Sequence, residues 1–124
     1  MDVLTMLRVS AVLFAISALG GLTMAWIRLG RGVNPPSWLA MLHGLVAAAG
    51  LTLLAYATFT AGVPLLAACA LALFVIAALG GMTMNLAYHL HDQPLPRALL
   101  LAHATLAVIA FVLLLLVVLR PAGG

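Results

Sequence analysis

Residues 13–24 have the sequence LFAISALGGLTM, and residues 73–84 have the sequence LFVIAALGGMTM. Nine of these twelve positions are identical, which is more than a shared richness in leucine and alanine explains. The match lies at a fixed shift of sixty residues and extends beyond the quoted stretch. We therefore interpret the chain as two tandem repeats, residues 3–60 and residues 63–120.

The composition indicates an integral membrane protein. The chain has 124 residues, of which 67% are hydrophobic and 6% are charged. A soluble domain of this size cannot bury so much apolar surface, so we expect a single transmembrane domain over residues 1–124. Four apolar segments have the length of about 20 residues that a helix needs to cross a bilayer. They are residues 7–29, 38–60, 63–88 and 98–120.

The predicted fold class is an all-α, four-helix transmembrane bundle made of two tandem parallel helical hairpins. No alternating strand pattern is present, and backbone groups in lipid have to pair within their own segment. Each repeat holds two spans, so both hairpins cross in the same sense, related by an axis along the membrane normal. In an up-and-down bundle of this kind, the second and fourth helices are diagonal partners.

His43 and His103 are the strongest candidates for a functional site. Each lies a few residues inside an apolar segment, at matching positions of the two repeats. An imidazole is costly to place in lipid, so it indicates function. On diagonal helices, the two rings reach opposite sides of one metal ion at the bundle axis. The alternative is a pair of neutral histidines that form hydrogen bonds between helices.

Small residues surround the two histidines. Gly20 and Gly21 share a helix side with Ser17 at helical spacing, and Gly80 and Gly81 hold the matching positions in the second repeat. Such residues leave room for something large and flat beside the histidines. They equally suit close packing of neighbouring helices.

The order of glycine, histidine, glycine and histidine on successive helices resembles the four-helix core of transmembrane b-type cytochromes. The resemblance covers most of the chain and is carried by Gly20, Gly21, His43, Gly80, Gly81 and His103. Larger cytochromes of this kind usually have two histidines on each ligand helix and hold two haems. Each helix here has one, so the resemblance implies a single haem b with His43 and His103 as axial ligands. It further implies one-electron transfer with a quinone or another redox protein.

The resemblance also implies supporting roles at the loop side of the site. Arg28, Arg31 or Arg97 would pair with the haem propionates. Thr23 and Thr83 would accept the ring N–H of a ligand histidine and fix its orientation.

Two other interpretations remain open. Met24 and Met84 lie at a depth similar to that of His43 and His103, and together they would form a soft site for Cu(I) in a copper-transit protein. The third interpretation is a cofactor-free structural subunit of a larger membrane complex.

The sequence favours an electron-transfer protein over a self-contained enzyme. The only acidic residues, Asp2 and Asp92, lie outside the spans, which argues against carboxylate acid–base catalysis. No Ser-His-Asp set, phosphate-binding loop, zinc motif or dinucleotide fingerprint is present.

The arginines indicate topology rather than a nucleic-acid partner, because they lie near the ends of the spans. The histidine-side loops carry Arg28, Arg31 and Arg97, and the opposite side carries Arg8 and Arg120. We expect a protein of the bacterial inner membrane, embedded in the lipid bilayer, with the histidine-side loops in the cytoplasm.

Overall fold

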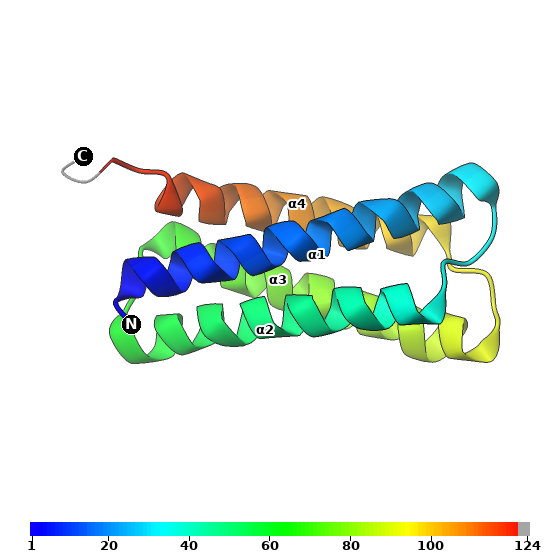
Figure 1. Cartoon of the computed structure of the whole chain (residues 1–124), viewed down its shortest axis with the longest axis horizontal. Coiled ribbons are helices and arrows are strands. Elements are labelled where there is room, and N and C mark those ends of the chain that lie inside the picture. The colour runs from blue at the N-terminus through cyan, green and yellow to red at the C-terminus, as the bar shows by residue number, and fades with distance from the viewer. Residues whose placement is uncertain (122–124) are drawn as a thin grey trace.

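The computed structural model describes residues 1–121, and four long helices run side by side in it as one elongated bundle (Figure 1). They are α1 (Val3–Arg31), α2 (Ser37–Ala61), α3 (Leu65–Thr83) and α4 (Arg97–Val118). The helix of α3 continues as a π-helical turn, η1 (Met84–Tyr88), and a 3₁₀ turn, η2 (His89–His91). α1, α2 and α4, and α3 together with its continuation to His91, are each long and apolar enough to cross a membrane. The prediction of an all-helical chain with four helices of membrane-spanning length and apolarity is thus confirmed for the described residues.

The helix boundaries follow from local capping. The Asp2 carboxylate accepts hydrogen bonds from the Thr5 backbone N–H at 2.9 Å and the Thr5 hydroxyl at 2.7 Å, so α1 begins earlier than residue 7. α2, α3 and α4 each follow directly on a proline, which has no N–H to leave unpaired. α1 ends at Gly32, whose φ of 72° is the left-handed conformation that glycine adopts without strain.

The bundle has up-and-down connectivity. The α1–α2 and α3–α4 connections meet at one end, which we call the loop end, while the N-terminus and the α2–α3 connection lie at the opposite end (Figure 1). α1 packs most extensively on α2, and α3 on α4; α1 also borders α4, and α2 borders α3. The second and fourth helices are therefore diagonal partners, as expected.

The buried side chains form two separate clusters. The larger one fills the half of the bundle away from the loop end and includes Phe14 on α1 and Phe74 on α3. These two rings stack across the bundle axis with centroids 3.7 Å apart and planes 5° from parallel. The smaller cluster lies at the loop end and comprises Met84, Leu95 and Leu100. The predicted histidine site lies between the two clusters.

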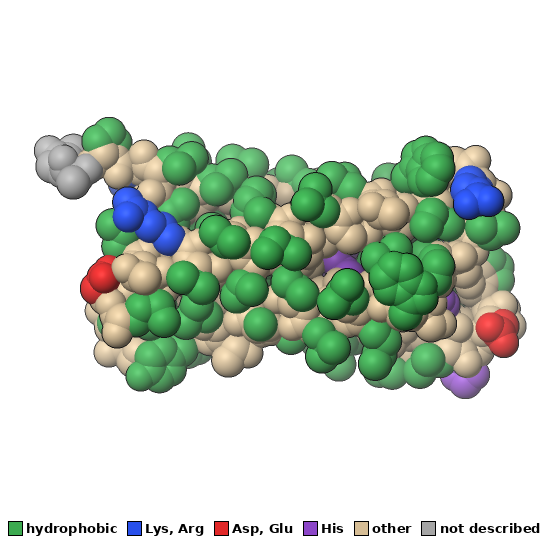
Figure 2. Space-filling model, in the orientation of Figure 1, with side chains coloured by type: hydrophobic (Ala, Val, Ile, Leu, Met, Phe, Trp, Pro, Cys, Tyr) green, Lys and Arg blue, Asp and Glu red, His purple; other side chains and the backbone are tan. Residues whose placement is uncertain are grey.

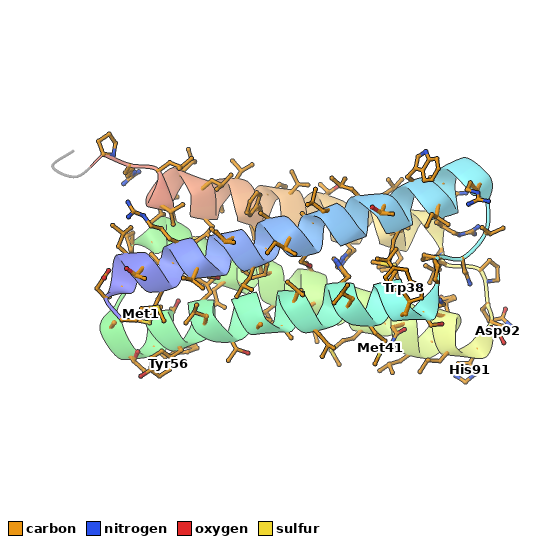
Figure 3. All side chains as sticks on the ribbon, viewed as in Figure 1. Met1, Trp38, Met41, Tyr56, His91 and Asp92 are labelled. Atoms are coloured by element: carbon orange, nitrogen blue, oxygen red, sulfur yellow. The ribbon has the colours of Figure 1, made fainter. Side chains whose placement is uncertain are left out.

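The outer surface has the pattern of a membrane-embedded protein. Apolar side chains cover the length of the face in Figure 2, and the charged side chains gather at the two ends. His91 and Asp92 lie at the loop end, and Tyr56 lies toward the opposite end (Figure 3). Together with the four apolar helices, this surface is consistent with an integral membrane protein.

Hydrogen bonds hold the two loops together at the loop end. The Asn34 side chain donates to the Gln93 carbonyl at 2.8 Å and accepts from the Leu95 backbone N–H at 3.1 Å. Nε of Arg28 donates to the Leu95 carbonyl at 2.9 Å. Nε2 of His89 lies 2.9 Å from the Pro35 carbonyl, which makes it the donor in that contact. Side chains and backbone of both hairpins thus form one cap over the histidine layer.

Candidate functional site

His43 and His103 meet across the centre of the bundle, as the sequence predicts. Their ring centroids are 6.2 Å apart, and the ring planes form an angle of 72°. His43 comes from α2 and His103 from α4, the diagonal pair. Each is six residues into its helix, which places both about 9 Å from the loop end of their helices at the usual rise per residue.

A backbone carbonyl of the neighbouring helix fixes each ring. Nδ1 of His43 lies 2.8 Å from the carbonyl oxygen of Ser17, and Nδ1 of His103 lies 2.6 Å from that of Ala77. A carbonyl oxygen only accepts, so Nδ1 carries the hydrogen in both rings. Nε2 is then the nitrogen that each ring has left to offer a ligand, because Nδ1 is occupied by its hydrogen bond.

Gly21 and Gly81 allow the rings to reach these carbonyls. Gly21 lies four residues after Ser17 on α1, so its backbone N–H points at the Ser17 carbonyl that His43 also contacts. A Cβ atom at Gly21 would lie 3.0 Å from Cε1 of His43, and one at Gly81 would lie 3.1 Å from Cε1 of His103. A side chain at either position would push the imidazole away from its hydrogen bond.

The structure adds a role to the one expected for the glycines. We expected them to make room for the edge of a flat cofactor, but their near neighbours are the imidazole rings themselves. At Gly20 and Gly80 the nearest atom to an added Cβ is the histidine Cβ, at 3.6 and 3.9 Å, which is ordinary contact. Of the four glycines, Gly21 and Gly81 are the ones that the histidine positions require.

The two threonines are not the partners of the ring nitrogens. Thr23 and Thr83 are exposed, and their hydroxyls donate to the carbonyls of Leu19 and Leu79, one turn back on their own helices, at 2.8 Å. A hydroxyl on a helix readily bonds the carbonyl four residues earlier, and this local bond is the one observed. The expected orienting contact is made instead by backbone oxygens.

Ser17 is a site residue to which the sequence assigned no role. Its hydroxyl donates to the backbone carbonyl of His43 at 3.1 Å and lies 3.0 Å from Nδ1 of the same residue. Ser17 is buried, with 4% of its surface exposed. Its place on the helix side that carries Gly21 was the available signal.

The arginines lie above the histidines at the loop end. Arg28 is half-buried and uses two donors on backbone carbonyls, Nε on Leu95 and Nη1 on Gly32 at 2.7 Å. Arg31 and Arg97 are exposed at the ends of their helices. Arg28 therefore has a structural task in the loop cap in addition to any ligand contact.

The methionines separate in their surroundings. Met84 is buried against Leu95 and Leu100, while Met24 is half-buried on α1. Over residues 1–121, no group of three or more His, Cys, Asp or Glu side chains is arranged to hold a metal ion. The chemistry that this part of the chain offers is a pair of imidazole nitrogens.

The histidine layer is less densely covered than the clusters on either side of it. His43, His103, Gly21 and Gly81 point toward the interior of the bundle, yet each is only half-buried. Both imidazole rings are therefore partly accessible at the surface of the bundle.

Comparisons of the chain with protein-family models, with curated proteins and with solved structures find no match. The functional conclusion consequently rests on the geometry of the two histidines.

Proposed function

We propose that this protein is a membrane b-type haem protein that carries single electrons, with one haem held between Nε2 of His43 and Nε2 of His103. The observation that supports the proposal most is the separation of the rings. A metal–imidazole bond is about 2.0–2.1 Å, and a ring centre lies roughly 1.1 Å from its atoms, so two imidazoles on opposite sides of one ion have centroids about 6.3 Å apart. The observed centroids are 6.2 Å apart.

The donor set favours haem over a bare ion. Two imidazole nitrogens complete the coordination of an iron that already has four porphyrin nitrogens, whereas a bare zinc ion normally takes four ligands from the protein. The bound haem would supply one-electron redox chemistry. Because His43 and His103 would both bind the iron, such a site would suit electron transfer rather than the binding of a gas or a substrate.

The residues around the rings have the tasks that such a site needs. Hydrogen bonds from Nδ1 to the carbonyls of Ser17 and Ala77 orient the two ligands and raise their basicity. Apolar clusters border the layer on both sides. Arg31 and Arg97, at the loop end, carry the charge that propionates pointing toward that end would pair with.

The position of the layer supports one haem and electron exchange at one end. Beyond His43, α2 continues for eighteen residues to Ala61, about 27 Å of helix, and the stacked Phe14–Phe74 pair fills the axis there. The loop end of α2 is about three times closer to His43 than the opposite end is. We propose that a quinol or another redox protein exchanges electrons there, and that this end faces the cytoplasm of a bacterial inner membrane.

The two hairpins present their histidines through matching contacts, which fits our interpretation of the chain as two tandem repeats. The offset between ring and carbonyl is the same in both, 26 residues. A duplicated hairpin would bring one ligand from each copy to a shared axis.

The test is the absorption spectrum of the protein purified in detergent, after expression with haem available. We expect a low-spin b-type spectrum on reduction and one haem per chain. His43→Ala and His103→Ala should each abolish it. His91→Ala is the matched control, because His91 is an exposed loop-end residue, and it should keep the spectrum.

The rival interpretations give different results in the same preparation. Copper that co-purifies without haem and is lost in Met24→Leu would refute the haem proposal in favour of a Cu(I) site. A colourless, metal-free protein that takes up no added haem would refute both.

A further inference from the structure

The two histidines are held by different groups. Ser17 faces His43 at the place where Ala77 faces His103, so only His43 has a hydroxyl beside Nδ1. We propose that Ser17 is a positioning residue that makes the two imidazoles inequivalent ligands. This inference rests on the proposed haem site, but its hydrogen-bonding part holds for the protein without haem.

The direction of each hydrogen bond follows from the donors present. The Ser17 carbonyl only accepts, so Nδ1 of His43 carries a hydrogen directed at it, at 2.8 Å. The Ser17 hydroxyl directs its own hydrogen at the His43 carbonyl, at 3.1 Å. Its lone pair then faces Nδ1 at 3.0 Å and takes a share of the same N–H. Ser17 thus forms hydrogen bonds to both the ring and the backbone of His43.

A hydrogen bond from Nδ1 raises the electron donation of an imidazole to a metal. His43 directs its N–H at two oxygens, whereas His103 has one shorter bond, 2.6 Å long. Removing the hydroxyl of Ser17 weakens donation from His43 and leaves His103 unchanged. Weaker donation disfavours the oxidised iron, so the midpoint potential should rise.

The chain supplies a control for a merely structural role. Ser10 lies seven residues earlier on α1 and donates to the Gly50 carbonyl on α2 at 2.8 Å. It is fully buried and joins the same two helices as Ser17, but it contacts neither imidazole. Ser10→Ala therefore removes a comparable interhelical bond without touching the site.

The experiment compares Ser17→Ala, Ser10→Ala and the reverse change Ala77→Ser with the wild-type protein. In haem-free protein labelled with ¹⁵N-histidine, NMR should show exchange of the His43 Nδ1–H about 2- to 10-fold faster in Ser17→Ala and unchanged in Ser10→Ala. In haem-loaded protein, the midpoint potential should rise in Ser17→Ala and fall in Ala77→Ser.

The outcomes separate the two proposals. Equal effects of Ser17→Ala and Ser10→Ala, or no effect of Ser17→Ala on exchange and potential, would overturn the role of Ser17 even if haem binds. Faster exchange confined to Ser17→Ala in a protein that binds no haem would support the hydrogen-bonding role and overturn the haem site. If Ser17→Ala does not fold, Ala77→Ser decides, and an unchanged potential there refutes the inference.

Discussion

Gly21→Ala tests whether the position of the His43 ring depends on the absence of a side chain at residue 21. The added methyl would lie 3.0 Å from Cε1 and 3.4 Å from Nδ1 of His43. Ordinary contacts of this kind begin at about 3.4 Å, so the ring has to move by a few tenths of an ångström. The methyl stands between the ring and α1, so the movement lengthens the 2.8 Å bond to the Ser17 carbonyl toward the limit of about 3.2 Å.

The magnitude follows from the bond at risk. A hydrogen bond of this type contributes about 0.5–1.5 kcal/mol, so we expect haem affinity to fall about 2- to 10-fold. Gly20→Ala is the matched control, because its methyl meets His43 Cβ at 3.6 Å, an ordinary contact. Both substitutions gain the roughly 0.5–1 kcal/mol by which alanine exceeds glycine inside a helix. Their difference therefore isolates the displacement of the ring.

The assay is titration of the haem-free protein with haemin, followed by absorbance, with thermal unfolding of the haem-free protein measured in parallel. Gly81→Ala and Gly80→Ala repeat the comparison at His103, with added-methyl distances of 3.1 and 3.9 Å. Equal haemin affinities for Gly21→Ala and Gly20→Ala would falsify the reasoning. A loss in both that scales with reduced thermal stability would also refute it, because the effect would then be general rather than local.

Four further substitutions follow from the contacts. Arg28→Ala removes the bond to the Leu95 carbonyl that joins the two loops. The free energy of unfolding should fall by about 1–3 kcal/mol, and the thermal midpoint should fall with it. Unchanged stability would show that the loop cap is not energetically important. Phe14→Ala opens a cavity at the stacked phenylalanine pair and should lower the free energy of unfolding by about 3–5 kcal/mol, measured by unfolding in detergent. The haem absorption spectrum should keep its position. A shifted spectrum would show that the phenylalanine pair and the histidine site are coupled. Thr23→Val and Thr83→Val should leave haem affinity within about twofold of wild type, because both hydroxyls bond carbonyls of their own helices. A larger loss of affinity in the haemin titration would support their predicted role at the site.

The spans and the meeting of the histidines were predictable because both depend on side-chain chemistry at helical spacing. Apolar length marks the helices, and up-and-down connectivity sets which helices are diagonal. His43 and His103 then meet because they enter the bundle from the same end at the same depth.

The orienting contacts were not predictable in the same way. The partners of Nδ1 are backbone oxygens, and every residue has one, so the sequence does not single out Ser17 or Ala77 for this role. The sequence points to Thr23 because a hydroxyl is a recognisable partner, but the Thr23 hydroxyl bonds a carbonyl of its own helix instead. α1 begins earlier than hydropathy predicts, because hydropathy does not register the cap that Asp2 provides.

The way in which Asn34 bridges the two loops has a consequence for the covalent chain. Asn34, in the first hairpin, bonds Gln93 and Leu95 in the second, so the halves are joined at the loop end as well as by the peptide link at the far end. That link is short, exposed and turns at Gly62. If the chain is divided at this link and the two hairpins are expressed as separate fragments, we therefore expect them to associate in the membrane and re-form the four-helix bundle.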